Sequence, residues 1–325
     1  MQSKYTVGIR CSTYNQKQYI EQTLNGFVIQ KTSFPFVAMI VDDASTDGQQ
    51  DVILSYIKSN FDTSDETFYR KETDYAEVLF ARHLTNRNCY FAVLFLKENH
   101  YQKDLHYKKL EYLTEWRNNM TYEALCEGDD WWIDPDKLQK QVDFLDSHQD
   151  YVMCTTSYSS FVMRDGQIRK GIDGGDGKDI SLRNLMKKNT IGTLTVMYRM
   201  QVLNQYEKVV RPHIPKFQMG DVPLWLFIAS KGKIHELPCT TAMYRVLDSS
   251  ASHSRDFDRQ YRFFIEASRV RFWMNKFLKT HYAGMIWFRL LIDTRHFCRR
   301  WAKNNGESRI SLWKKAIRIL KASEL

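Results

Sequence analysis

Short apolar runs alternate with segments of helical spacing through the first half of this 325-residue chain, and this alternation limits the possible folds more than any other feature. Runs with strand character occupy residues 5–11, 36–41, 90–96 and 122–126. Apolar residues recur with helical spacing in residues 17–29, 50–58, 107–119 and 137–148. Strands that alternate with helices pair through right-handed crossovers. The pattern therefore predicts an α/β fold in which helices flank a mainly parallel central sheet.

The second half of the chain is less regular. Its sequence predicts strands at residues 151–163, 194–198 and 233–246, a turn at 164–166, a loop at 171–177 and a helix at 223–230. From residue 257 onward the pattern is helical and basic. A helical extension is therefore expected to follow the sheet.

Two Asp-Asp pairs follow strand-like runs. Asp42-Asp43 comes directly after the second run, and Asp129-Asp130 comes shortly after the fourth. In parallel α/β sheets, ligands bind beyond the carboxyl ends of the strands. The two pairs are therefore expected on the same edge of one sheet.

The pair Asp129-Asp130 has the chemistry of a cation site. Mg²⁺ and Mn²⁺ take oxygen ligands, often one or two carboxylates together with substrate phosphates. Gly128 allows the backbone to approach a ligand closely. For the dipeptide alone, a solvated turn with a helix-capping Asp is the alternative. The adjoining Trp131-Trp132 either walls a sugar or base pocket or packs in the core.

Three further segments carry candidate groups. Ser12, Tyr14 and Asn15, in the loop after the first strand, can frame a flat base, although an ordinary strand-to-helix turn has the same composition. A carboxylate at Asp43 can accept hydrogen bonds from a base or a ribose hydroxyl, or cap the next helix. Asp221 precedes a Pro at a normal helix start, so it is either a catalytic carboxylate or a helix cap.

Taken together, four separated segments resemble the family 2 glycosyltransferases, which have the GT-A fold. In this chain they read Ser12-Thr13-Tyr14-Asn15, Ile40-Val41-Asp42-Asp43-Ala44-Ser45-Thr46-Asp47-Gly48, Cys126-Glu127-Gly128-Asp129-Asp130-Trp131-Trp132 and Met219-Gly220-Asp221-Val222-Pro223-Leu224-Trp225. The second is similar to the frequent "VDDGSTDG" motif, with Ala44 in place of glycine. The third is similar to the D-x-D region in the "EGDDYW" form of bacterial surface-polysaccharide enzymes.

The resemblance implies a role for each matched residue. Residues of the first three segments would bind the donor nucleotide: Ser12, Tyr14, Asn15, Asp43 and Asp129. Of these, Asp129 would face the ribose or the sugar. Asp130 would ligate Mn²⁺ or Mg²⁺, and Asp221 would be the general base.

The function implied by the resemblance is that of an inverting glycosyltransferase. It would move a sugar from a nucleoside diphosphate-sugar, expected to be a UDP-sugar, to a hydroxyl of a glycan or lipid-linked acceptor in surface polysaccharide biosynthesis. Two other functions are weighed. A non-catalytic GT-A domain would bind nucleotide-sugar or act as a scaffold, which the presence of Asp130 and Asp221 argues against. A nucleotidyltransferase would need a Gly-rich basic phosphate loop, which residues 12–18 do not supply.

The excess of basic residues lies in the C-terminal part of the chain. The net charge is +9, and residues 255–325 hold 17 Lys and Arg against 6 Asp and Glu. We expect a glycosyltransferase domain at 1–250 and a basic amphipathic helical region at 251–325. The apolar face of residues 310–320 either contacts an anionic membrane surface or packs on the catalytic domain. No nucleic-acid-binding module accompanies the charge, so nucleic acid is not an expected partner.

Cysteine spacing and hydropathy bear on the compartment. The six cysteines include no Cys-x-x-Cys pair, which argues against a structural zinc site and predicts buried free thiols in a reducing compartment. The N-terminus has no apolar signal region, and the apolar stretch at residues 282–288 is too short to span a bilayer. The sequence therefore predicts a cytoplasmic protein that can contact the inner face of the cell membrane.

Overall fold

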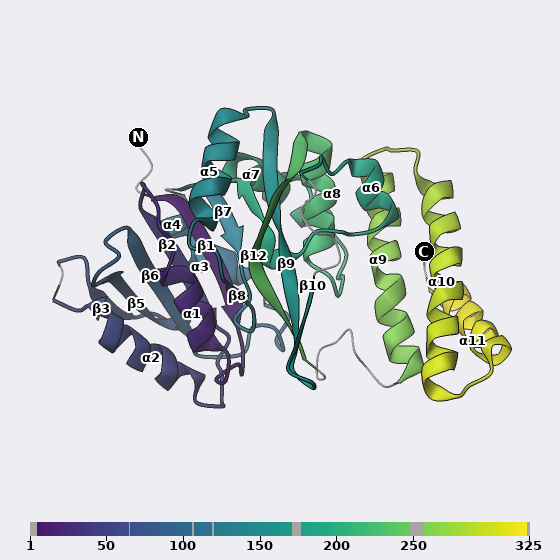
Figure 1. The fold of residues 1–325 in the computed structure, drawn as a ribbon, viewed down its shortest axis with the longest axis horizontal. Helices are drawn as coiled ribbons and strands as arrows, with labels where there is room; N and C mark the ends of the chain where they lie inside the picture. The colour runs from purple at the N-terminus through teal and green to yellow at the C-terminus, as the bar shows by residue number, and fades with distance from the viewer. Residues whose placement is uncertain are drawn as a thin grey trace.

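A large mixed sheet forms the centre of the protein, with helices on both faces and a helical region at the C-terminal end (Figure 1). The computed structural model describes residues 5–64, 66–105, 107–118, 120–170, 177–247 and 256–323. The strands are β1 Tyr5–Thr13, β2 Phe36–Asp42, β3 Phe61–Asp62, β4 Tyr69–Glu72, β5 Ala76–His83, β6 Cys89–Leu96, β7 Met120–Leu125, β8 Trp131–Trp132, β9 Tyr151–Val162, β10 Gln167–Lys170, β11 Met197–Arg199 and β12 Lys233–Val246. The helices are α1 Ile20–Val28, α2 Gln49–Asn60, α3 Lys108–Tyr112, α4 Thr114–Arg117, α5 Lys137–Ser147, α6 Leu182–Lys187, α7 Met200–Val209, α8 Asp221–Lys231, α9 Phe257–Phe277, α10 Ala283–Asn305 and α11 Arg309–Ala322. The predicted α/β fold with a helical extension is confirmed.

Four neighbouring strands, β6, β2, β1 and β7, run parallel and form the centre of the sheet. On one side β5 is antiparallel to β6. On the other side β11 is antiparallel to both β7 and β9, and the sheet ends with β12 and β8. The parallel arrangement expected from the sequence is thus found in the centre, whereas most flanking strands pair in antiparallel fashion.

The register of the central strands brings their carboxyl ends together. Thr13 at the end of β1 is opposite Asp42 at the end of β2, and Arg10 of β1 is opposite Leu125 at the end of β7. Because the three strands run in the same direction, the chain leaves all of them at one edge of the sheet. The predicted common edge for the two Asp-Asp pairs is confirmed.

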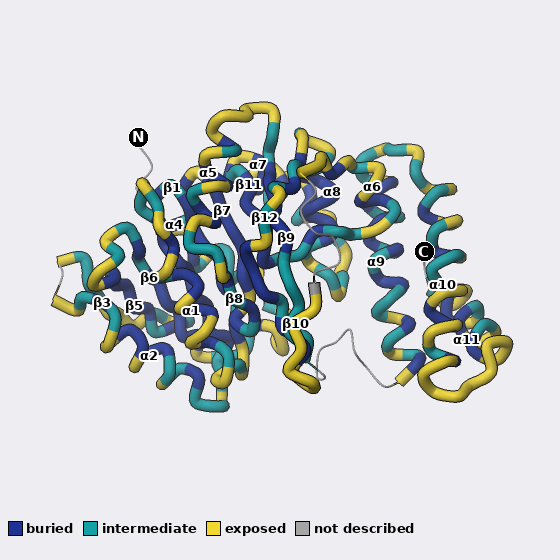
Figure 2. Tube along the Cα trace, viewed as in Figure 1, coloured by how far each residue is buried: buried dark blue, intermediate teal, exposed yellow. Residues whose placement is uncertain are grey.

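The central strands bury side chains on both faces of the sheet. On β2, Phe36, Ala38 and Ile40 pack in one core with α1, α2 and α5. Val37 and Met39 pack in the other core with α4, α7 and α8. Figure 2 shows the buried segments gathered along these strands. Burial on both faces explains why β2 is a continuous apolar run rather than an alternating one.

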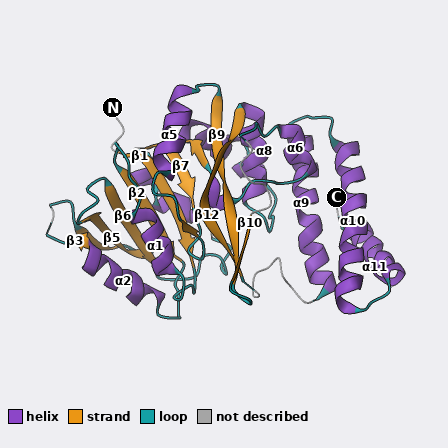
Figure 3. Cartoon of the chain, viewed as in Figure 1, coloured by secondary structure: helices purple, strands orange, loops and turns teal. Residues whose placement is uncertain are grey.

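The C-terminal region consists of helices, as Figure 3 shows. Helix α9 packs against α8, and α10 and α11 pack against α9. The apolar face of α11 is covered, because Leu312, Ala316, Ile319 and Leu320 are buried in a cluster with residues of α9 and α10. These four residues pack on the neighbouring helices of the C-terminal region. They do not pack on the expected catalytic domain, and their side chains are covered. The expected boundary between residues 250 and 251 lies outside the described residues.

Some elements differ from the sequence-based expectation. Residues 107–119 form two short helices, α3 and α4, and Asn119 lies outside the described residues. The strand expected at 194–198 begins as the 3-10 turn Thr193–Thr195 before β11. The loop expected at 171–177 lies outside the described residues except for Gly177. The short strands β3 and β8 were not predicted, because two residues carry no periodicity to detect.

Two further expectations concern the cysteines and the membrane. All six cysteines are free, and five of them are buried. Within the described ranges, no helix combines the length and the apolar character that a membrane span requires.

A buried carboxylate, Glu123 of β7, ties the sheet together beneath the carboxyl edge. Its side chain is fully buried, with Arg10 Nε and Arg117 Nε each 3.0 Å from a carboxylate oxygen. Tyr198 donates a third hydrogen bond at 2.6 Å. Burial alone would raise the pKa of Glu123, but Arg117 and Arg10 outweigh it, and the net shift is downward. One side chain therefore links β1, α4, β7 and β11.

Replacing Glu123 by Gln should destabilise the fold strongly. The substitution leaves two arginines without their buried counter-charge, and loss of one partner of a buried ion pair costs about 3–5 kcal/mol. Chemical denaturation should show that decrease in the free energy of unfolding. The control is Glu115→Gln, which removes an exposed pairing with Lys71 and should cost less than about 1 kcal/mol. Equal effects of the two substitutions would contradict the role of Glu123.

Candidate active site

Loops after β1, β2 and β7 meet at the carboxyl edge of the sheet and are joined by backbone hydrogen bonds. Asp43 N donates to Thr13 O at 3.0 Å, and Gly128 N donates to Ser12 O at 3.1 Å. A Cβ added to Gly128 would lie 2.3 Å from Thr13 Oγ1. The loop after β1 therefore lies between the other two, and glycine permits the close approach of the third.

Side chains reinforce the contact between the first two loops. Asn15 N donates to Ser45 Oγ at 2.9 Å, and Thr46 N donates to Asn15 Oδ1 at 2.8 Å. Asn15 and Ala44 have φ values of 51° and 60°. Left-handed backbone costs a residue with a Cβ about 1–2 kcal/mol, so these contacts hold a strained pair of loops. Asn15, predicted to bind nucleotide, has its amide oxygen engaged in this role.

The carboxylate of Asp43 is buried and already has partners in the segment after β6. His100 N donates to its Oδ1 at 2.9 Å, and Tyr101 N donates to its Oδ2 at 3.1 Å. Lys109 Nζ lies 2.9 Å from the same Oδ2. A nucleobase that binds Asp43, as predicted, has to share these oxygens with the protein donors.

Ser12 and Tyr14 are more exposed to solvent than Asp43. Tyr14 is 38% exposed and Ser12 is partly exposed. In the described part of the chain, neither hydroxyl has a hydrogen-bond partner, so both remain available to a ligand at this edge.

Asp129 and Asp130 lie against the end of β12. Asp130 is 2% exposed, and its Oδ1 accepts a hydrogen bond from Arg245 N at 2.8 Å. Arg245 Nε donates to the carbonyl oxygen of Asp129 at 2.7 Å. Burial, followed by Asp129 and Glu127, raises the pKa of Asp130 well above its usual range. Burial also raises the pKa of Asp129. Arg245, which the sequence reasoning missed, anchors this loop.

Glu127 connects the two most distant motifs of the site. The residue as a whole is exposed, but burial of its carboxyl group, followed by the carboxylates of Asp129 and Asp221, raises its pKa to about 7. Asp221 lines one cavity together with Tyr244. The residue after Tyr244 is Arg245, whose backbone N–H donates to Asp130 Oδ1 at 2.8 Å. The end of β12 therefore connects Asp221 with the loop after β7. The sequence reasoning did not name Glu127 as a site residue, although Glu127 lies in the third motif, two residues before Asp129.

Asp221 is the first residue of α8 and does not cap that helix. The capping position belongs to Gly220, and no side chain makes a capping hydrogen bond there. Burial raises the pKa of Asp221, although backbone N–H groups of Val222 and of Asp221 itself act in the opposite direction. Asp221 therefore occupies the first turn of α8 rather than the N-cap, and its carboxylate is near backbone N–H groups of that turn.

The two tryptophans differ in environment. Trp132 is 1% exposed, packs edge-on against Phe27 with ring centroids 5.2 Å apart, and donates from Nε1 to Leu194 O at 2.8 Å. Trp132 is therefore a core residue with no ring face open to a pocket. Trp131 is partly exposed and lies 4.4 Å from the guanidinium carbon of Arg245, so it alone borders the carboxylate cluster.

The carboxylate cluster has the chemistry of a divalent-cation site. Glu127, Asp129, Asp130 and Asp221 supply hard oxygen ligands. Across the described residues, none of these carboxylates has a Lys or Arg side chain in ion-pair contact, and the pKa of each is raised. The described residues form no complete cage of three or more metal-binding side chains. An ion here therefore needs further ligands from phosphate or water.

The chain is similar in sequence to bacterial proteins, although no protein-family model matches it. It is 31% identical over 248 residues to an uncharacterized protein of Mycobacterium tuberculosis strain H37Rv. The aligned part covers 76% of this chain and 61% of that protein. The chain thus spans about three fifths of the length of this relative. It is 26% identical over 253 residues, 78% of this chain and 83% of the other, to TuaG of Bacillus subtilis, a putative teichuronic acid biosynthesis glycosyltransferase.

Two solved structures with the same fold hold nucleotide-sugars. Staphylococcus aureus TarS 1–349 in complex with UDP-GlcNAc superposes with a TM-score of 0.53 at 14% identity, covering 90% of this chain and 81% of that one. The mannosyltransferase PcManGT from Pyrobaculum calidifontis, in complex with GDP-Man and Mn²⁺, superposes with a TM-score of 0.50 at 13% identity. The superposition covers 99% of this chain and 75% of that one. These likenesses confirm the predicted GT-A fold.

Glu127 should make the stability of the protein depend on pH. Its ordinary pKa is 4.5 and its pKa in the folded protein is about 7, so the folded state holds the proton more tightly than the unfolded state. This contribution is fully present below about pH 4.5 and is lost as the pH rises through about 7. Glu127→Gln cannot ionise and should lack the loss, so its stability relative to the wild type should rise from about pH 5 to about pH 8.

Denaturation at a series of pH values measures this difference. Glu115→Gln, at the exposed surface, serves as the control and should follow the wild type. Parallel profiles for Glu127→Gln and the wild type would show that Glu127 titrates normally.

Proposed function

We propose that this chain is an inverting, divalent-metal-dependent glycosyltransferase of family 2. The observation that carries the proposal is the placement of Asp129-Asp130 beside the loop of the donor candidates: Gly128 N donates to Ser12 O at 3.1 Å, and Arg245 N donates to Asp130 Oδ1 at 2.8 Å. The sheet itself has the fold of proteins whose solved complexes hold UDP-GlcNAc or GDP-Man. A non-catalytic domain has no need to keep two adjacent carboxylates at this edge.

The donor is a nucleoside diphosphate-sugar, with UDP as the expected nucleotide. Ser12 and Tyr14 have free hydroxyls at the edge where the base would lie, and Asp43 offers a carboxylate that Lys109 holds in place. Asp129 would contact the ribose or sugar, and Asp130 would ligate Mn²⁺ or Mg²⁺. The similarity to TuaG favours surface polysaccharide biosynthesis as the setting.

Transfer requires charge stabilisation and proton removal. A bound divalent cation supplies Lewis-acid stabilisation of the departing diphosphate. Asp221 removes the proton from the acceptor hydroxyl as that oxygen attacks the anomeric carbon. Burial raises the pKa of Asp221, which makes it a stronger base than an exposed aspartate. One base attacking opposite the leaving group inverts the anomeric configuration.

Asp221→Asn and Asp130→Ala should fail in different ways. The amide of Asp221→Asn cannot accept the proton, so transfer should fall by about 100-fold or more while calorimetric binding of the nucleotide-sugar is kept. Asp130→Ala should lose the Mn²⁺-dependent part of the affinity for UDP. Release of nucleoside diphosphate from a panel of UDP- and GDP-sugars measures turnover, and the exposed Asp136→Asn is the control.

The outcomes separate the candidate functions. Unchanged turnover in Asp221→Asn would overturn its role as base. Equal UDP affinity with and without Mn²⁺ in the wild type would overturn the metal requirement. Donor binding without transfer by the wild-type protein would instead support the non-catalytic binding domain.

We further propose contact with an anionic membrane through residues other than the buried face of α11. Exposed apolar side chains gather on α10 and at the start of α11, where Phe288 is 68% and Ile310 is 69% exposed. Arg295, Arg299 and Arg309 line the same hollow as Ile310. Apolar side chains with arginines beside them suit an interface rich in anionic lipid.

Phe288→Ser combined with Ile310→Ser should weaken sedimentation with vesicles that contain phosphatidylglycerol. Each change removes apolar area that would enter the headgroup region. Ile168→Ser provides a control, because Ile168 is 66% exposed on β10. Equal sedimentation of the double variant and this control would contradict the proposed surface.

A further inference from the structure

A large cavity lies between the candidate base and the C-terminal helices. Its volume is about 1220 Å³, and it reaches from Asp221 and Val222 of α8 to residues of α9 and α10. The end of α6 forms another wall. Figure 1 shows α6, α8, α9 and α10 as neighbours at this end of the molecule. A molecule bound in this cavity would therefore have one end beside Asp221, the residue proposed as the general base.

The cavity opens toward the carboxylate cluster but is not the donor side. Tyr244 of β12 lines it together with Asp221. Tyr244 directly precedes Arg245, whose backbone N–H donates to Asp130 Oδ1 at 2.8 Å, so this part of β12 lies beside Asp130. The donor candidates in the loops after β1 and β2 do not line the cavity. The cavity is therefore on the acceptor side of Asp221.

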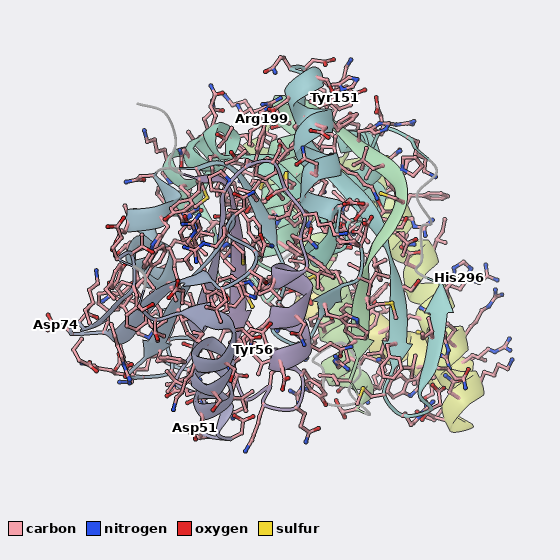
Figure 4. All side chains as sticks on the ribbon, turned by 60° about the vertical axis from the view of Figure 1, so that its left-hand side comes forward. Asp51, Tyr56, Asp74, Tyr151, Arg199 and His296 are labelled. Atoms are coloured by element: carbon pink, nitrogen blue, oxygen red, sulfur yellow. The ribbon has the colours of Figure 1, made fainter. Side chains whose placement is uncertain are left out.

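The walls of the cavity carry an excess of positive charge. Among the described residues, six Lys and Arg side chains line it: Lys187, Lys188, Arg271, Arg289, Arg299 and Arg300. In the same described part of the chain, two carboxylates line it, Asp221 and Asp293. Asp293 pairs with Arg289 at 2.8 Å, so most of the cationic side chains have no carboxylate of the cavity to neutralise them. His296, labelled in Figure 4, adds a further titratable group on α10.

Arg271 is the most informative of these cations. It is 8% exposed, and its Nε donates to Leu185 O at 3.1 Å. Within the described part of the chain, its two terminal nitrogens have no partner. Burial lowers the pKa of Arg271 to about 10, with Asp293 opposing and Arg289 adding to the shift. A buried guanidinium that lines a cavity and has no carboxylate in ion-pair contact among the described residues is suited to receive an anion.

Aromatic rings lie beside the cations. Phe263, Phe264 and Trp301 line the same cavity. Aromatic faces can cover the apolar faces of sugar rings, while a guanidinium binds phosphate with two parallel hydrogen bonds. The cavity therefore offers both kinds of contact that a phosphorylated saccharide requires.

We infer that this cavity binds the acceptor and recognises a phosphate group that the acceptor carries, with Arg271 as the buried contact and Lys187 and Arg300 on the open wall. This inference rests on the proposed function in placing the acceptor hydroxyl at Asp221. The phosphate belongs either to a lipid diphosphate that carries the growing glycan or to a polymer joined by phosphodiesters. Both sources present the same group to Arg271.

Calorimetry with two probes tests the inference in the full-length protein. Geranyl diphosphate represents the lipid-linked source, and a trimer of glycerol phosphodiesters represents the polymer. EDTA is present, so that metal-dependent binding at the donor side does not contribute. At least one probe should bind, and Arg271→Gln should weaken it about tenfold or more, as expected for loss of a charge-assisted hydrogen bond. The probe that binds more tightly identifies the source.

Matched variants guard against a folding defect. Arg300→Gln changes an exposed wall residue and should also weaken the probe, whereas Arg262→Gln, exposed on α9 and outside the cavity, should not. Affinity for UDP with Mn²⁺ should be the same in all three variants. Failure of both probes to bind, or equal affinities in Arg271→Gln, Arg300→Gln and Arg262→Gln, would overturn the inference.

The two proposals fail independently. If the arginine variants leave probe binding unchanged while Asp221→Asn abolishes transfer, the proposed function is supported and the proposed phosphate site is wrong. If probe binding depends on Arg271 while Asp221→Asn retains full turnover, the cavity binds phosphate but the catalytic assignment falls.

Discussion

Parallel pairing of β1 with both β2 and β7 is the constraint on which the candidate site depends. A strand exposes its loop to the same edge as its neighbour only if the two run in the same direction and end at the same level. Here Thr13 is opposite Asp42, and Arg10 is opposite Leu125. The ion pairs of Glu123 with Arg10 and Arg117 lie directly beneath that edge. A shift in the pairing of β1 with β2 or β7 would move the loops apart. The same shift would break the ion pairs of Glu123 with Arg10 and Arg117.

The second half of the chain contributes two residues to the candidate site, Arg245 and Asp221. Arg245, at the end of β12, holds the Asp129-Asp130 loop through its backbone N–H and its guanidinium. Helix α8 precedes β12 and carries Asp221 at its first position. The edge of the parallel strands thus supplies most of the carboxylates, and the later segment supplies Arg245, which holds the loop, and the partly exposed base candidate Asp221.

Much of this arrangement could be predicted from the sequence, because burial on both faces makes β1, β2, β6 and β7 apolar runs that end in turn-forming residues. The same reasoning located the loops that hold Asp43, Asp129 and Asp130. The sequence could not indicate that the oxygens of Asp43 are engaged by residues after β6, since those contacts depend on tertiary packing and not on spacing.

Two further contributions to the site have no local signature. Arg245 binds the loop through its backbone N–H, which every residue type except proline provides, and through a guanidinium whose partner depends on tertiary packing. The roles of Trp131 and Trp132 were equally undecidable, because neighbouring residues on a strand point to opposite sides. Only the pairing of β8 with β12 determines which ring is buried.

The packing of α9 on α8 has a consequence for how proteins with this architecture diversify. The donor-side loops come from residues before 131, whereas α9 and α10 contribute most of the cavity beyond Asp221. Two stretches of chain thus border one base from opposite sides. Under the proposed function, substitutions in the C-terminal helices would alter which molecule receives the sugar without disturbing which sugar is given. Selection would then act on the two choices separately, and new linkages would arise from an inherited donor.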